Sequence, residues 1–283
     1  MEHFTTRQLR AGGLSEKQIR SAVARGALIR LRIGHFARPD ASAAAMSAVR
    51  AGGSLACVSE LRHRGVWVLD SPQLHIRVAR NAARLPDQAV RRHWDTRPPA
   101  DDGHVDVVSA LIQAHGCLER RAWIASVDSA LHIGALQPSQ LPELRSGLPQ
   151  LGRRALDLTD RRAESGLESI VRVIALDLGL RVRSQVRVAG VGRVDLIVEG
   201  WVVIETDGSA FHDQPLSARD RARDARLVAG GRAALRPGYS LIVYNQPAVA
   251  RQLIGAVATH RRVAGSGRIV ARARRRAAIL GLS

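Results

Sequence analysis

Aromatic residues, cysteines and acidic residues are all scarce in this chain. These shortages exclude an aromatic core, a disulfide framework and a neutral net charge. Only 3% of the 283 residues are aromatic, so a core has to be built from the aliphatic residues that dominate the 46% hydrophobic fraction. Cys57 and Cys117 are too few for a disulfide framework, and their spacing does not indicate a metal cluster. We therefore expect a reduced, cytoplasmic protein. No apolar run approaches the roughly 20 residues of a membrane span, and no signal-peptide pattern begins the chain.

The shortage of acidic residues leaves a large positive charge. The chain has 43 Lys and Arg against 25 Asp and Glu, which gives a formal net charge of +18 and a pI near 11.6. This charge favours polyanions, with nucleic acid first and an anionic membrane surface second. A genome rich in G and C would explain why Lys17 is the only lysine, but not the excess of cations. Residues 263–283 carry arginines and no acid, and we expect them to form a flexible basic tail.

The first forty residues have the pattern of two helices followed by a hairpin. Thr5 or Thr6 can cap a first helix and Ser15 a second, and each helix ends at a glycine. Residues 28–37 alternate apolar and basic residues around a glycine, which is typical of a short hairpin. This order describes a winged helix-turn-helix, which we place in residues 1–75. The cations expected to face DNA are Lys17, Arg20, Arg30 and Arg32.

The middle segment, residues 76–159, has no pattern that points to chemistry. Residues 42–66 look helical, strands are indicated at 73–79 and 90–94, and residues 107–147 are predicted to be helical. The histidines lack the spacing of ligands, and we interpret each as an ordinary core or surface residue. They are His63, His75, His93, His104, His115 and His132. The simplest role of the segment is a scaffold, and a role in homodimerisation stays open.

From residue 160 onward the sequence is more informative. Apolar residues recur every three or four positions over 164–178, which predicts a helix with Glu168 near its start. Two strands follow, at 193–198 and 201–208, and a tight turn joins them.

The register of this hairpin decides where its acidic residues point. A two-residue turn would place Asp195 and Glu205 on opposite faces, with Glu205 beside apolar residues. A three-residue turn over 199–201, with Gly200 at positive φ, pairs Asp195 with Glu205. This register separates an apolar face from an acidic face that also holds Asp207, and we therefore prefer it.

Paired carboxylates suit a divalent cation. Directly opposed side chains have Cβ atoms about 5 Å apart, and carboxylate oxygens are the ligands that Mg²⁺ or Mn²⁺ takes. Such an ion polarises a phosphodiester, and Glu168 could add an outer carboxylate. The alternative is a solvated acidic face that forms salt bridges with nearby arginines.

A histidine and an arginine-rich helix follow the acidic strand. His212 is placed to act as a general base, a general acid or a phosphate ligand. Residues 217–227 predict a helix with Arg219, Arg223 and Arg226 along one side, a cationic ridge suited to a negatively charged substrate. Ion pairs within this helix can coexist with that role.

Residues 160–262 resemble the Vsr-like family catalogued as domain of unknown function 559, which is related to the very-short-patch-repair endonuclease. The motifs behind the resemblance are Ser165-x-x-Glu168, Val194-Asp195, Ile204 to Gly208, Phe211-His212 and Arg219-Asp220-x-x-Arg223-Asp224. The resemblance implies a three-layer PD-(D/E)XK nuclease fold with one metal site, in which Asp195 is the main ligand and Glu205 assists. Residues 4–37 are similar to the N-terminal winged helix of AbiEi-type antitoxins.

One departure from the family pattern bears on catalysis. Asp207 stands where the motif ends in a lysine, so His212 or an arginine would have to take over that role. We therefore keep two functions open. The first is a Mg²⁺- or Mn²⁺-dependent endonuclease that acts on DNA in repair or defence. The second is an antitoxin-like DNA-binding regulator with an inactive nuclease fold and, by that resemblance, a partner toxin.

Together these predictions describe an α+β multidomain protein. We expect a winged helix-turn-helix, a mostly helical middle segment, a C-terminal α/β/α restriction-endonuclease-like domain and a basic tail. The expected partner is DNA, and no membrane is involved.

Overall fold

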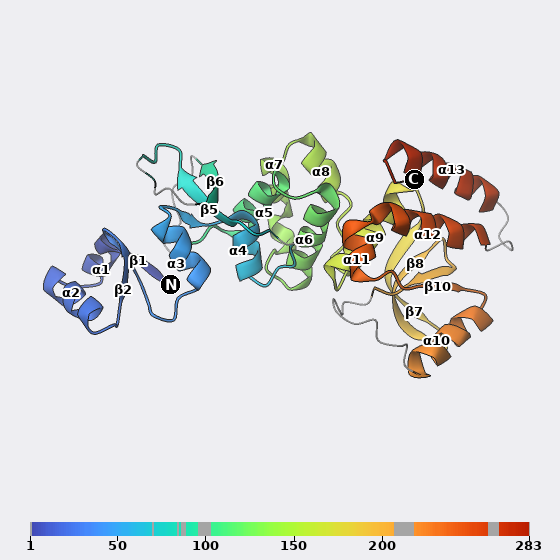
Figure 1. The fold of residues 1–283 in the computed structure, drawn as a ribbon, viewed down its shortest axis with the longest axis horizontal. Coiled ribbons are helices and arrows are strands. Elements are labelled where there is room, and N and C mark those ends of the chain that lie inside the picture. Colours follow the sequence, from blue (N-terminus) through green and yellow to red (C-terminus); the bar gives the residue numbers. More distant parts are fainter. Residues whose placement is uncertain are drawn as a thin grey trace. The chain divides into compact units, whose positions relative to one another are not determined.

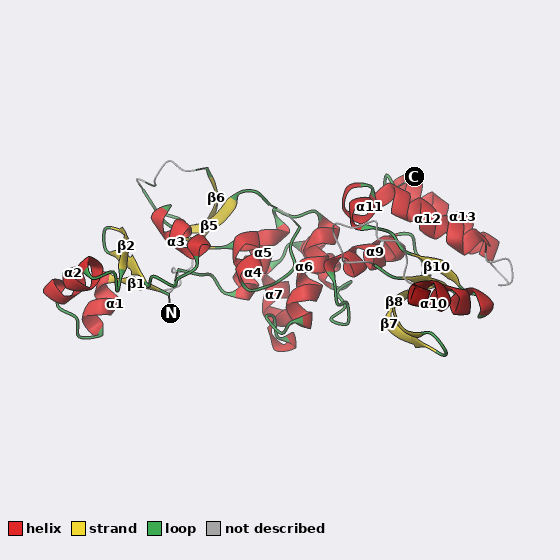
Figure 2. Ribbon diagram, turned by 60° about the horizontal axis from the view of Figure 1, so that its bottom comes forward, coloured by secondary structure: helices red, strands yellow, loops and turns green. Residues whose placement is uncertain are grey.

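The computed structural model describes residues 2–69, 71–83, 85, 89–95, 103–206, 218–259 and 266–282. These residues form a mixed α+β protein with thirteen α-helices, one short 3-10 helix and three small sheets (Figures 1 and 2). The chain divides into two compact units, each made of two stretches of sequence. The first unit comprises 1–119 with 133–153, and the second comprises 120–132 with 154–283. In the described parts of the chain, none of the helices has the length and hydrophobicity needed to cross a bilayer.

The first unit begins with the predicted pair of helices and basic hairpin. Its elements are β1 (His3–Thr5), α1 (Thr6–Ala11), α2 (Glu16–Ala24), β2 (Ile29–Arg32) and β3 (His35–Ala37), and the sheet order is β1-β3-β2. Thr5 and Ser15 are the N-caps of the two helices, and each forms a capping box with a glutamine three residues later. Leu9, Ile19 and Phe36 form the small core beneath the two helices. The predicted caps and helix order are confirmed.

The rest of the first unit is a second small sheet with helices around it. Its elements are α3 (Ala43–Arg50), β4 (Ser54–Leu55), α4 (Cys57–His63), β5 (Leu74–Ala79), β6 (Val90–Asp95), α5 (Val107–His115), the 3-10 helix η1 (Pro138–Gln140) and α7 (Leu141–Gly147). The helical stretch predicted over 42–66 is interrupted by β4, which pairs antiparallel with β5. Strand β5 also pairs parallel with β6, and the two predicted strands are confirmed. Helix α8 (Gln150–Leu156) spans the boundary in sequence between the two units.

The second unit is built on a four-stranded sheet of order β10-β9-β8-β7. Its elements are α6 (Arg120–His132), α9 (Gly166–Asp177), β7 (Val182–Val188), β8 (Gly192–Val198), β9 (Val202–Ile204), α10 (Ala218–Ala229), β10 (Ala233–Leu235), α11 (Tyr239–Tyr244), α12 (Gln246–Thr259) and α13 (Ser266–Ile279). Helices α9 and α12 contact the sheet, while α10 packs Leu227 in one cluster with Ile197 and Val203. Side chains on both faces of β8 and β9 are buried, with Leu196 and Ile204 on one face and Ile197 and Val203 on the other. Both faces of the sheet are therefore covered.

Hairpin β8–β9 has the register predicted from the segregation of its side chains. Leu196 pairs with Ile204 and Val198 with Val202 across the turn. Gly200 has a φ of +89°, and Glu199 before it also lies in the left-handed region at +51°. The three-residue turn is confirmed. The face that holds Asp195 is not purely acidic, however, because Ile197 and Val203 on the same face are buried against α10.

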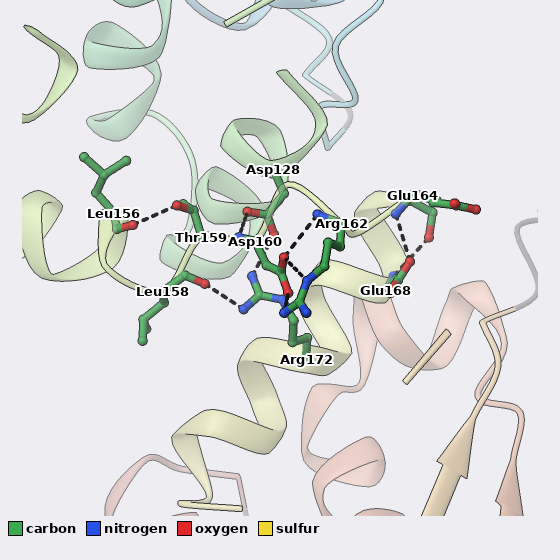
Figure 3. Close-up of polar contacts among 10 residues, drawn as sticks. Asp128, Leu156, Leu158, Thr159, Asp160, Arg162, Glu164, Glu168 and Arg172 are labelled. Atoms are coloured by element: carbon green, nitrogen blue, oxygen red, sulfur yellow. Dashed lines mark hydrogen bonds and ion pairs between the residues drawn. The ribbon is translucent and has the colours of Figure 1, made fainter. Parts of the chain in front are cut away.

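A buried ion pair joins α6 to α9 in the second unit, although the sequence placed residues 120–132 in the middle segment. Arg172 of α9 donates from Nη2 to Oδ2 of Asp128 on α6 at 2.7 Å, and both side chains are almost fully buried. Asp128 also accepts a hydrogen bond from the backbone N–H of Asp160 at 2.7 Å (Figure 3). These contacts fix α6 against the start of the C-terminal segment.

The prediction of a flexible basic tail is wrong for residues 266–279, which form α13. Ala273 and Ala277, four residues apart, are buried on one side of this helix, which packs against α12. On another side, Arg272 donates to the carbonyl oxygen of Gly179 at 2.7 Å and Arg276 to that of Asp177 at 2.6 Å. These carbonyls lie at the C-terminal end of α9, where the helix dipole favours cations. Arg272 and Arg276 therefore have acceptors, and the repulsion among the arginines does not keep the segment unfolded.

Candidate functional sites

Asp195 lies in β8 and is half-buried. Its Oδ2 accepts hydrogen bonds from the backbone N–H of Thr206 at 2.9 Å and from the Thr206 hydroxyl at 3.3 Å. These bonds tie it to the residue after Glu205, as the hairpin register requires. Among the described residues, Oδ1 of Asp195 takes part in none of these hydrogen bonds, so one oxygen is left for a ligand.

Glu205 follows β9 and is buried, with both carboxylate oxygens in ion pairs. Arg223 contacts Oε1 and Arg236 contacts Oε2, each at 2.7 Å. Arg236 also donates to Asp224 at 2.9 Å. Burial raises the pKa of Glu205, the two arginines lower it, and the negative charge of Asp195 raises it further. For this residue the structure shows the salt bridges that the sequence left open as the alternative to a metal.

Glu168, one turn into α9, is only 1% exposed and has no ion pair among the described residues. Its carboxylate accepts a hydrogen bond from the backbone N–H of Glu164 at 2.9 Å (Figure 3). It also accepts from Nε2 of Gln185 at 3.0 and 3.1 Å. Burial raises the pKa of Glu168 to about 7, and the nearby charge of Asp195 adds to this rise. The sequence did not predict Gln185, which holds this carboxylate from β7 with a left-handed φ of +53°.

The remaining residues predicted for this site are brought together only in part. Asp207 and His212 lie outside the described residues, as does the side chain of Arg219 in α10. Arg226 is exposed, whereas Arg223 contacts Glu205 and also donates to the carbonyl oxygen of Arg193. Arg223 therefore serves the acidic site itself rather than a free cationic ridge.

The four cations predicted to face DNA are all exposed on the N-terminal helix pair and hairpin. They are Lys17 and Arg20 on α2, and Arg30 and Arg32 on β2. Arg20 and Arg30 line one surface cavity of about 400 Å³ between α2 and the hairpin. Ile33 at the hairpin tip is 85% exposed. The surface thus combines a groove with positive charge and a protruding tip.

A second site lies in the first unit, where the sequence predicted none. The side chains of Cys57, His75, His93 and Cys117 place one ligand atom each within 4.8 Å of one another. His75 Nδ1 lies 3.1 Å from His93 Nε2, and Cys117 Sγ lies 3.9 Å from the same nitrogen. The interpretation of these cysteines and histidines as unrelated residues is therefore wrong. We refer to these four residues as the Cys2His2 cluster.

Long-range pairing explains why the sequence did not reveal the Cys2His2 cluster. Its members come from the start of α4, from β5, from β6 and from the residues after α5. The parallel register pairs His75 with Arg91, so His93, two residues further on, lies on the same face as His75. No local spacing carries this information. The sequence did predict two strands with one histidine each. Only the register between these strands shows that the two histidines lie close together.

Another group, formed by Glu2, His63 and His104, meets the same distance limit but has a poorer arrangement for a metal. The rings of His63 and His104 are stacked, with centroids 4.6 Å apart and an angle of 26° between their planes. Nδ1 of His104 lies 2.7 Å from the buried carboxylate of Glu60. An ordinary hydrogen-bonded histidine accounts for this group.

No protein-family model matches the chain, and no curated protein matches it either. The functional interpretation therefore depends on the geometry of the residues themselves.

Proposed function

We propose that this protein binds DNA and that its second unit hydrolyses DNA phosphodiesters with the help of Mg²⁺ or Mn²⁺. The observation that carries the proposal is the gathering of three carboxylates, Glu168, Asp195 and Glu205, in a chain of net charge +18. Asp195 accepts from the residue after Glu205, Glu168 accepts from Gln185 of the neighbouring strand β7, and the charge of Asp195 acts on both glutamates. A cluster of carboxylates is unfavourable unless something compensates it, because each negative charge makes the others harder to ionise. Perturbed groups of this kind concentrate at functional sites.

The residues present fit a divalent cation best at Asp195. Asp195 has one carboxylate oxygen outside the hydrogen bonds to Thr206, and Glu168 is buried close enough to sense its charge. A cation held by Asp195, with Glu205 as the assisting ligand, would supply Lewis-acid polarisation of a phosphodiester. Asp207 and His212, the nearest residues along the chain with suitable chemistry, are proposed to orient water and transfer the proton. Arg226 is proposed to bind the adjacent phosphate, together with Arg219.

DNA is proposed to bind first to the N-terminal helix pair and hairpin, acting as a winged helix-turn-helix. Lys17 and Arg20 would contact phosphates around the major groove, and Arg30 and Arg32 would contact the backbone from the wing. The exposure of all four side chains and the groove shared by Arg20 and Arg30 support this placement.

One observation favours a second candidate, a DNA-binding regulator with an inactive nuclease fold. Both oxygens of Glu205 are already paired with arginines, so a metal would have to displace at least one of them. An acidic site neutralised in this way could support the fold without catalysing a reaction.

Nicking of supercoiled plasmid separates the two candidates. The assay compares the wild-type chain in Mg²⁺, in Mn²⁺ and without added metal with the Asp195→Asn variant and with Asp157→Asn, an exposed aspartate of the same unit. The nuclease proposal expects metal-dependent nicking that Asp195→Asn abolishes and Asp157→Asn preserves. Salt-sensitive DNA binding without nicking in either metal would establish the regulator instead.

A further inference from the structure

The Cys2His2 cluster has the donor set and arrangement of a zinc site. Zinc in structural sites is held by thiolate sulfur and imidazole nitrogen in a tetrahedron, whereas Mg²⁺ and Ca²⁺ prefer oxygen. A tetrahedral site with Zn–S bonds of ~2.3 Å and Zn–N bonds of ~2.0 Å places neighbouring ligand atoms about 3.3 to 3.8 Å apart. His75 Nδ1 lies 3.1 Å from His93 Nε2, and Cys117 Sγ lies 3.9 Å from the same nitrogen. Both separations are within a few tenths of an ångström of this range.

We propose that Cys57, His75, His93 and Cys117 bind one zinc ion that joins α4, α5 and the β5–β6 pair of the first unit. This site is separate from the acidic site of the second unit and does not depend on nuclease activity. Two thiolates neutralise the charge of one Zn²⁺, so the occupied site carries no net charge into a buried position. Binding would form two zinc–sulfur bonds and two zinc–nitrogen bonds and release the two thiol protons to solvent.

Neighbouring groups orient the proposed ligands. Nε2 of His75 lies 3.3 Å from the hydroxyl of Ser71, which leaves Nδ1 as the ligand atom and fixes the ring. The backbone N–H of Cys57 donates to Oε1 of Gln113 at 3.1 Å. Cys57 is the first residue of α4, and its φ of +52° is strained for a residue other than glycine. Strain of this kind persists where surrounding contacts fix a side chain in place.

The site is both protected and accessible. Cys57 and His75 are buried, while His93 and Cys117 are partly exposed and line a surface cavity of about 470 Å³. A metal can therefore enter from the side of His93 and Cys117.

The fold offers a reason for such a site. The hydrophobic core between α3 and β4–β5 consists of Ala48, Ala51, Leu55, Ile76 and Val78. A metal ion bound beside this core would add a cross-link between elements that lie far apart in the sequence. The proposed zinc would hold β6, the edge strand of this sheet, against the two helices.

Metal analysis of the full-length chain, purified without chelators, tests the proposal. We expect one zinc per chain in the wild type and in His63→Gln, which alters an exposed histidine outside the Cys2His2 cluster. Cys117→Ser and His93→Gln should each lose it. Full zinc content in both of these variants would overturn the site.

Two measurements on the wild-type chain keep the proposal testable if those variants fail to fold. Co²⁺ added to reduced, metal-free protein should give the visible bands of a tetrahedral ion and a thiolate-to-cobalt charge-transfer band. The two thiols should resist alkylation in the zinc-loaded chain and react after metal removal. Absence of both the zinc and the cobalt spectrum, or a Cys57–Cys117 disulfide in protein made in a reducing cytoplasm, would overturn the proposal.

Discussion

At the scale of single residues, Glu168 is a buried carboxyl that has no ion pair within the described parts of the chain. Its pKa is raised from 4.5 to about 7, and a raised pKa means that the folded state favours the protonated form. The stability contributed by Glu168 is therefore fully present below about pH 4.5 and is lost as the pH rises through about 7.

The Glu168→Gln variant should remove this dependence. Between pH 5 and pH 8 the wild type should lose about 2–3 kcal/mol of unfolding free energy relative to the variant. Urea unfolding of both proteins at the two pH values measures the difference. If the wild type and the variant differ in unfolding free energy by the same amount at both pH values, Glu168 has the same pKa in the folded and the unfolded chain.

Contacts within one hairpin could be predicted from the sequence, whereas contacts between distant segments could not. Asp195 and Glu205 could be paired from the alternation of side chains across one hairpin, and the structure has that register. Arg236 could not be predicted as a partner of Glu205, because the two meet only through the parallel pairing of β10 with β9. The Cys2His2 cluster was missed for the same reason, since its members come from α4, β5, β6 and the residues after α5.

At the scale of elements, capping chemistry and charge led to predictions of different quality. The helices after Thr5 and Ser15 were predicted correctly because a capping box is encoded within four residues. The expected flexible tail was wrong because it relied on charge alone. The four-residue spacing of Ala273 and Ala277 was the helical signal, and the carbonyls of α9 that accept from the arginines lie almost a hundred residues earlier in the chain.

The packing of α13 can be tested with two matched substitutions. Ala277→Leu enlarges a buried side chain and should destabilise the second unit by about 1–3 kcal/mol through overpacking. Ala278→Leu makes the same change at an exposed position and should have little effect. Thermal unfolding of the two variants measures this, and equal stabilities would mean that α13 is not docked.

At the scale of the whole molecule, the net charge of +18 should govern DNA binding. The logarithm of the binding constant should fall linearly with the logarithm of salt concentration, by about one unit of slope for each phosphate neutralised. Lys17→Ala and Arg20→Ala should each reduce the slope by about one unit if they contact phosphates. Arg251→Ala, an exposed arginine of the second unit, is the control. A slope near zero would make the charge irrelevant to binding.

The two proposed metals also impose a constraint on experiments with the whole chain. A strong chelator would remove Mg²⁺ from the acidic site and zinc from the Cys2His2 cluster, so loss of activity in EDTA would not identify either site. Zinc-loaded protein in chelator-free buffer, with Mg²⁺ added or withheld, separates the two.

The most direct measurement is the rate of Mg²⁺-dependent plasmid nicking by zinc-loaded wild-type protein and by Asp195→Asn under the same conditions. The proposed nuclease activity requires nicking by the wild type and a loss of at least about a hundredfold in the variant, with DNA affinity and zinc content unchanged. Equal nicking by the two proteins, or none by the wild type in Mg²⁺ or Mn²⁺, would contradict it.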